Sequence, residues 1–184
     1  MAELQQLVYI SRASFAPSRQ GLGVEPEVGR ILVQSRLNNP RRGLVGALYY
    51  GDGHFFQCLE GPSEAIDALY VKLLADTRHR DLKVLSRSNI SRASFTDWAM
   101  KYVPGANEVK ALLKKHGHAR FDPYRFNPAA VRDMVTLLHR GSDASTEPSP
   151  GASRSTPRGA GRWIMPAVAV GIVIVATIAA WLLW

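Results

Sequence analysis

The sequence is poor in cysteine and lacks the short motifs that many enzymes carry. Its 184 residues include a single cysteine, Cys58, which excludes a disulfide framework or a zinc site built from cysteines and is typical of a reducing compartment. There is no G-x-S-x-G, no phosphate-binding loop with a lysine and no H-E-x-x-H, so we do not expect a hydrolase. His116 and His118 lie close together without a cysteine or carboxylate at metal-ligand spacing, so we expect no metal site.

Positive charge exceeds negative charge, but it is not concentrated in one segment. The chain has 23 Lys and Arg against 15 Asp and Glu, a net charge of +8. Its densest basic pairs, Arg41 with Arg42 and Lys114 with Lys115, lack the interleaved aromatic side chains of nucleic-acid-binding surfaces. The pattern favours attraction to anionic lipid or to a phosphate-bearing ligand, and we expect no nucleic-acid partner.

The last 22 residues, 163–184, contain no charged side chain. As a helix they would extend roughly 33 Å, enough to cross a hydrocarbon core about 30 Å thick. Tryptophans stand at both ends, and Arg154, Arg158 and Arg162 precede the segment on the side expected to stay in the cytoplasm. We therefore expect a single transmembrane helix over 163–184 that anchors a cytoplasmic N-terminal part, in a bacterial inner membrane. A terminal helix packed on a soluble core is the alternative.

Hydrophobic patterning over the first 104 residues alternates between strand and helix. β-Branched and aromatic residues predict strands over 4–11, 44–50, 54–59 and 82–90, with a hairpin turn over 51–53. Apolar spacing predicts one helix that begins near Val24 and ends before Pro40, and a second with Ser63 as its N-cap. The order βαββαβ predicts an α+β, ferredoxin-like fold in which the first and third strands are central neighbours.

Further segments follow this core. An added short strand is predicted over 97–103. Two helices, 107–116 and 127–141, have too little apolar surface for a domain of their own, so they should cap the free face of the sheet. A stretch rich in Gly, Ser, Thr and Pro then predicts a flexible linker. The expected organisation is a core domain over 1–104, a helical cap over 105–140, the linker over 141–162 and the transmembrane helix.

Two polar side chains interrupt apolar strands. Tyr9 stands in L-V-Y-I-S and Gln57 in H-F-F-Q-C-L-E-G, where a buried amide without a partner would cost about 1–3 kcal/mol. If the first and third strands are neighbours, the two side chains come within hydrogen-bond reach, and Asn39 at the end of the first helix can reach the same space. A phenol and two amides suit a flat heterocycle with alternating donors and acceptors. The alternative is that Tyr9 and Gln57 bond only to each other or to backbone.

The run from Leu7 to Val103 resembles the BLUF domain, a family of flavin-binding blue-light sensors. Its motifs are L-V-Y-I-S-R-A, N-N-P-R-R-G-L-V-G-A-L, G-H-F-F-Q-C-L-E-G, D-T-R-H-R-D and F-T-D-W-A-M. The resemblance implies noncovalently bound FAD, with Tyr9 as the photoactive tyrosine and Gln57 as the switch glutamine. The implied cofactor-binding residues are Tyr9, Ser11, Ile31, Asn39, Phe56, Gln57, Ile66, Arg78 and His79, and the implied signal relay is Trp98 and Met100. Pro40 and a longer loop over 14–23 depart from the family pattern.

The resemblance also implies a photocycle without turnover. Blue light makes the flavin an oxidant, an electron and a proton leave Tyr9 with Gln57 as the proton relay, and on their return the Gln57 amide has rotated or tautomerised. The expected function is a photoreceptor that signals to a separate, unidentified partner protein, and homo-oligomerisation is left open. A flavin redox module and a ferredoxin-like interaction scaffold are the alternatives. Both are disfavoured because neither needs a tyrosine donor together with a buried amide.

Overall fold

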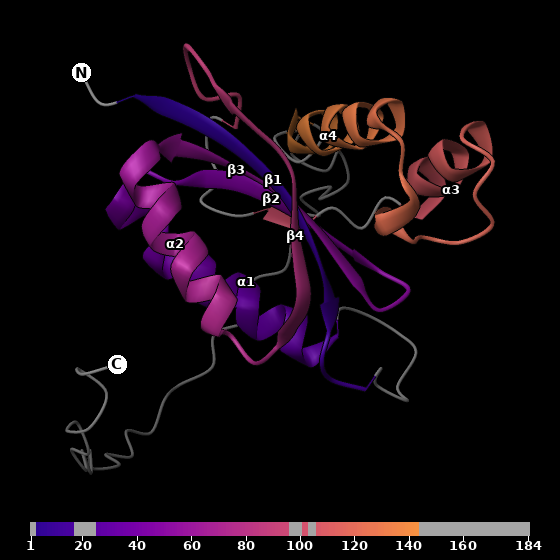
Figure 1. Cartoon of the computed structure of the whole chain (residues 1–184), viewed down its shortest axis with the longest axis horizontal. Coiled ribbons are helices and arrows are strands. Elements are labelled where there is room, and N and C mark those ends of the chain that lie inside the picture. The colour runs from indigo at the N-terminus through magenta and orange to yellow at the C-terminus, as the bar shows by residue number, and fades with distance from the viewer. Residues whose placement is uncertain (1–2, 17–24, 96–100, 103–105, 144–184) are drawn as a thin grey trace, which may run out of the picture. The chain divides into compact units, whose positions relative to one another are not determined.

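Five strands form one sheet in the computed structural model of the chain, which describes residues 3–16, 25–95, 101–102 and 106–143. They are β1 (Leu4–Ala13), β2 (Val45–Gly51), β3 (His54–Pro62), β4 (His79–Asn89) and β5 (Lys101–Tyr102). The sheet order is β4-β1-β3-β2-β5, with antiparallel pairs except for β2 with β5 (Figure 1). The first four strands have the predicted ferredoxin-like order, and β1 and β3 are central neighbours as predicted.

The register of β1 determines where its polar side chains lie. Tyr9 is the Cα partner of Gln57 on β3, and Leu48 of β2 is the partner of Gln57 on the other side. Along its other edge β1 pairs with β4 through two register irregularities, one of them between Val8 and Tyr9. Bulges of this kind re-aim side chains and are common beside functional sites.

Helices α1 (Pro26–Asn38) and α2 (Ser63–Ala75) lie together on one face of the sheet (Figure 1). Their buried apolar residues, Val28 and Ile31 of α1 and Ile66 of α2, share one core cluster with Tyr9 and Phe55 of the sheet. Because strand residues alternate between faces, this cluster collects every second residue of β1 and β3. The helices therefore cover the face that carries Tyr9.

The start of α2 differs from the prediction by one residue. Pro62 occupies the N-cap position, Ser63 is the first helical residue, and no side chain caps the helix. The Ser63 N–H instead donates to the carbonyl of Glu3 at 2.9 Å. A backbone contact with the beginning of the chain thus satisfies a donor at the point where a side-chain cap was expected.

Helices α3 (Ala106–Lys115) and α4 (Pro128–Asp143) lie on the opposite face of the sheet (Figure 1). Buried residues of these helices, among them Leu112 and Met134, pack with Val8, Ile10 and Cys58 in a second core cluster. The sheet is thus covered on both faces, and the two helices occupy the position expected for a cap.

The ends of α4 follow local chemistry. Oδ1 of Asn127 accepts a hydrogen bond from the Ala130 N–H at 2.8 Å, which satisfies a free donor of the first turn. The helix continues to Asp143, so the predicted end at Gly141 is wrong. A single glycine weakens a helix by only about 1 kcal/mol relative to alanine and need not end it.

The hairpin between β2 and β3 is tied to the cap. Asp52 and Gly53 have φ angles of 46° and 75°, the left-handed conformation that the tight turn requires. Oδ2 of Asp52 accepts a hydrogen bond from the N–H of Phe121 at 2.8 Å. The turn is therefore held by the segment that joins α3 to α4.

Several predicted segments lie wholly or partly outside the described residues. The short strand expected over 97–103 is seen as β5, which runs parallel to β2 opposite Ala47 and Leu48. Trp98 and Met100 lie outside the described residues, as do residues 144–162 of the predicted linker and the segment 163–184. Within the described ranges, no helix combines the length and the apolar character needed to cross a membrane.

Candidate functional site

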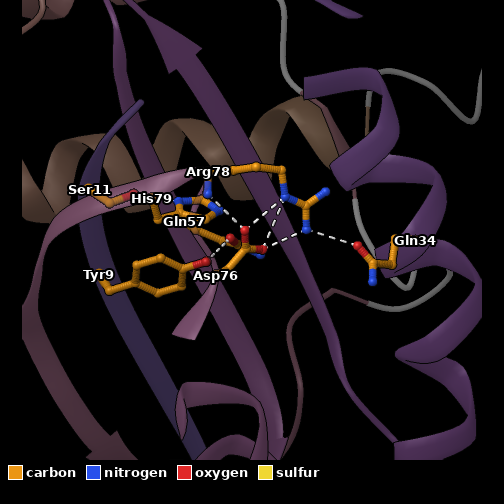
Figure 2. A network of polar contacts seen from close by, with 7 residues as sticks. All are labelled: Tyr9, Ser11, Gln34, Gln57, Asp76, Arg78 and His79. Atoms are coloured by element: carbon orange, nitrogen blue, oxygen red, sulfur yellow. Dashed lines mark hydrogen bonds and ion pairs between the residues drawn. The ribbon is translucent and has the colours of Figure 1, made fainter. Parts of the chain in front are cut away.

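Tyr9 and Gln57 form a hydrogen-bonded pair on the face covered by α1 and α2 (Figure 2). The Tyr9 hydroxyl donates to Oε1 of Gln57, and the two residues are 0% and 4% exposed. Burial, with a smaller contribution from the negative charge of Asp76, raises the pKa of Tyr9 far above its ordinary value. The phenol therefore stays protonated, with its proton directed at the amide oxygen. The pairing alone fits either prediction, a ligand site or a self-contained pair, and the neighbouring polar groups distinguish them.

Ser11 and His79 form a second polar contact near this pair (Figure 2). Ser11 is fully buried, and its Oγ lies 2.7 Å from Nδ1 of His79. Burial lowers the pKa of His79 to about 4, although the nearby Asp76 carboxylate opposes the shift. The imidazole is therefore neutral at pH 7. Its Nε2 is buried without a hydrogen-bond partner among the described residues, which is a polar position that a ligand could satisfy.

Arg78 connects the end of α2 to α1. Its Nη2 lies 2.5 Å from Oδ2 of Asp76, the residue after α2, and donates to Oε1 of Gln34 on α1 at 2.9 Å (Figure 2). Burial alone would raise the pKa of Asp76. The hydrogen bonds and positive charge of Arg78 outweigh burial and hold this pKa below its usual value. Asp76 is therefore a fixed negative charge close to the Tyr9 site.

Sequence reasoning missed two members of this network. It selected Arg78 and His79 from the run D-T-R-H-R-D but passed over Asp76, which an aspartate two residues before an arginine could have indicated. Nothing in the sequence marks Gln34, because its contact with Arg78 depends on how α1 lies beside α2.

Asn39 closes α1 and is 3% exposed. Its backbone N–H donates to Ser35 O at 2.8 Å, and its carbonyl accepts from the N–H of Leu44 at 3.0 Å. The chain reversal after α1 therefore satisfies its own backbone groups and holds the amide side chain of Asn39 at the helix end. Ile31 and Ile66 are buried in the cluster that contains Tyr9, so the structure supplies apolar side chains from both helices to the same region.

The structure does not bring every predicted site residue to this region. Phe56 packs in the cluster beneath α3 and α4, on the face of β3 opposite to Gln57. Neighbouring residues of a strand point to opposite faces, so Phe56 and Gln57 cannot line the same site. The proposed relay residues Trp98 and Met100 lie outside the described residues.

The BLUF family, described as "Sensors of blue-light using FAD", matches residues 4–101. The chain belongs to the BLUF family. Its fold resembles BlsA in the ground state with a TM-score of 0.65 and 30% identity, over 74% of this chain and 87% of BlsA. It also resembles the BLUF protein BlrB in the dark state, with a TM-score of 0.59 and 32% identity, over 79% of this chain and 98% of BlrB.

Relatives also occur within much longer proteins. The photoactivated adenylate cyclase subunit alpha of Euglena gracilis is 31% identical over 151 residues, which are 79% of this chain and 14% of that subunit. The chain spans about one sixth of the length of the curated relatives it matches. The BLUF domain is thus shared with these proteins.

The residues of this BLUF domain fit a flavin. An isoalloxazine ring presents acceptors and a donor along one edge and apolar surface on both faces. Neutral polar groups at Asn39, Gln57 and the unsatisfied Nε2 of His79 can meet such an edge without burying a charge. Ile31 and Ile66 supply apolar contacts from two helices. A self-contained Tyr9–Gln57 pair does not account for the unsatisfied imidazole nitrogen, which favours a ligand.

Proposed function

We propose that this protein is a blue-light photoreceptor that binds FAD noncovalently and signals to a separate protein, without catalytic turnover of its own. The observation that carries the proposal is the buried hydrogen bond from Tyr9 to Gln57 in a domain of the BLUF family. A simple electron carrier needs no oxidisable phenol coupled to an amide, and an interaction scaffold does not need to bury either group.

The binding residues are proposed from the geometry of the face beneath α1 and α2. Asn39 and Gln57 would meet the polar edge of the ring, Ile31 and Ile66 its faces, and His79 a further polar atom. When bound there, flavin would supply a one-electron oxidant that blue light activates beside Tyr9. The chain's own residues then determine where the proton of Tyr9 can go.

Tyr9 can release its proton directly to Gln57, because Oε1 of Gln57 accepts the hydrogen bond from its hydroxyl. Loss of the proton alone would leave a buried phenolate, which burial and the Asp76 charge both disfavour. The proton therefore leaves Tyr9 with the electron or after it, not before it. An amide has a donor end and an acceptor end, so Gln57 can return the proton with these ends exchanged and with a different set of hydrogen bonds.

A light-minus-dark absorption spectrum of the purified full-length chain tests this function. We expect a yellow protein whose flavin absorption shifts slightly to the red under blue light and returns in the dark. Colourless protein that takes up no added FAD would support the scaffold alternative. Bleaching of the flavin band, reversed only by an added oxidant, would support the redox alternative.

We further propose that residues 163–184 anchor the photoreceptor in a membrane with the BLUF domain in the cytoplasm. This rests on the uncharged run and the three arginines that precede it. The anchor would concentrate the sensor near its partner, whereas the signal itself would pass through the cap formed by α3 and α4.

A further inference from the structure

A cysteine, a glutamate and a histidine meet on the cap side of the sheet. Cys58 and Glu60 lie two residues apart on β3, so both point to the face opposite to Gln57. His139 comes from α4. One ligand atom from each of these three residues lies within 4.8 Å of the others.

The three side chains offer the donor atoms that zinc prefers. Zinc sites combine thiolate, imidazole and carboxylate ligands, and tetrahedral coordination places neighbouring ligand atoms about 3.3–3.6 Å apart. Nε2 of His139 and Oε1 of Glu60 are 3.5 Å apart, within that range. Cys58 and Glu60 are fully buried and His139 is 29% exposed, so an ion could enter from the side of α4.

The surroundings already orient Glu60 as a metal ligand would need. Nε2 of Gln6 donates to Oε1 of Glu60 at 2.8 Å, and the backbone N–H groups of Ser94 and Phe95 donate to Oε2. Carboxylate ligands of metals are commonly held by such outer contacts.

We propose that Cys58, Glu60 and His139 bind one Zn²⁺ ion, with water as a fourth ligand, and so fasten α4 to β3. Binding replaces the Cys58 thiol proton, which leaves to solvent as the sulfur–zinc bond forms, so one proton is released per ion. The sequence contains no zinc motif because the histidine is far from the cysteine along the chain. The proposal does not depend on flavin binding.

Cobalt substitution in the full-length protein tests the site directly. Co²⁺ should bind with one-to-one stoichiometry. In a difference spectrum against the protein without added metal, Co²⁺ should give a thiolate charge-transfer band in the near ultraviolet. It should also give ligand-field bands at wavelengths longer than those flavin absorbs, and Zn²⁺ should displace it. Cys58→Ala should abolish the charge-transfer band, and His139→Gln should abolish tight binding. Gln6→Leu should keep the bands and weaken affinity about 10–100-fold, as outer contacts of metal ligands do.

His116→Gln is the matched control, because His116 pairs with Asp133, which Lys115 also contacts, and could hold an adventitious ion away from the proposed site. This variant should bind Co²⁺ as the unmodified protein does. Far-UV circular dichroism verifies that each variant is folded. The proposal is overturned if the unmodified protein gives no thiolate band, if folded His139→Gln binds Co²⁺ unchanged, or if only His116→Gln loses the ion.

Discussion

Replacing Tyr9 by phenylalanine removes one oxygen atom and should separate flavin binding from photochemistry. The ring still fills the core between β1 and the helices, so the variant should retain flavin. Its blue-light difference spectrum should lose the reversible red shift, because no phenol can donate to Oε1 of Gln57. The assay is the light-minus-dark spectrum at equal flavin content.

The same substitution has a predictable effect on stability. It leaves a desolvated amide oxygen without its phenol donor, a loss of about 1–3 kcal/mol in the free energy of unfolding. For a domain of this size that corresponds to a decrease of roughly 2–12 °C in Tm, measured for both proteins in the same excess of FAD. Tyr124→Phe is the matched control, since the Tyr124 hydroxyl donates to Asp81 O at 2.5 Å in an exposed position. It should keep the photocycle and change stability by less than about 0.5 kcal/mol. A full red shift in Tyr9→Phe would refute the assigned role of the phenol.

Four further predictions concern the role of Gln57, the pH dependence of stability, attachment to a membrane and the response of α3 and α4 to light. Gln57→Leu should bind flavin but show no red shift, and a normal photocycle would exclude an amide relay. Because the pKa of His79 is about 4 in the fold and about 6.5 when unfolded, the unfolded chain binds the extra proton. The free energy of unfolding should therefore decrease as pH falls from about 6.5 to about 4. Urea titrations at several pH values should show that it depends less on pH in His79→Gln than in the unmodified protein. The full chain should stay with membranes through an alkaline wash, unlike a version ending at Asp143, and its recovery in the supernatant would refute the anchor. Light should alter hydrogen exchange most in α3 and α4. Identical exchange of these helices in light and dark would show that the cap takes no part in signalling.

The parts of this protein that could be predicted from sequence follow from short-range rules. Strand alternation and element order were enough to predict that Tyr9 and Gln57 meet, because the fold places the first and third strands together. The contact of Arg78 with Gln34 could not be predicted, since it depends on how two helices pack side by side. The prediction that Ser63 is the N-cap of α2 was wrong for a similar reason. The N–H of Ser63 is satisfied by the backbone of Glu3, which is distant in sequence.

Strand β3 carries Gln57, the proposed switch residue, on one face and Cys58 and Glu60, two of the three proposed metal ligands, on the other. Gln57 bonds to Tyr9 on one side, while Glu60 on the other bonds to Gln6 of β1 and to the N–H groups of Ser94 and Phe95. Glu60 also pairs with His139 of α4. Both neighbours of β3 are hydrogen-bonded to it along its length, so β3 cannot shift at Gln57 without moving the residues that follow. If light changes the hydrogen bonds of Gln57, Glu60 is therefore, among the described residues of β3, a group placed to carry the change to the cap. A metal that fastens Glu60 to α4 would make that coupling more rigid.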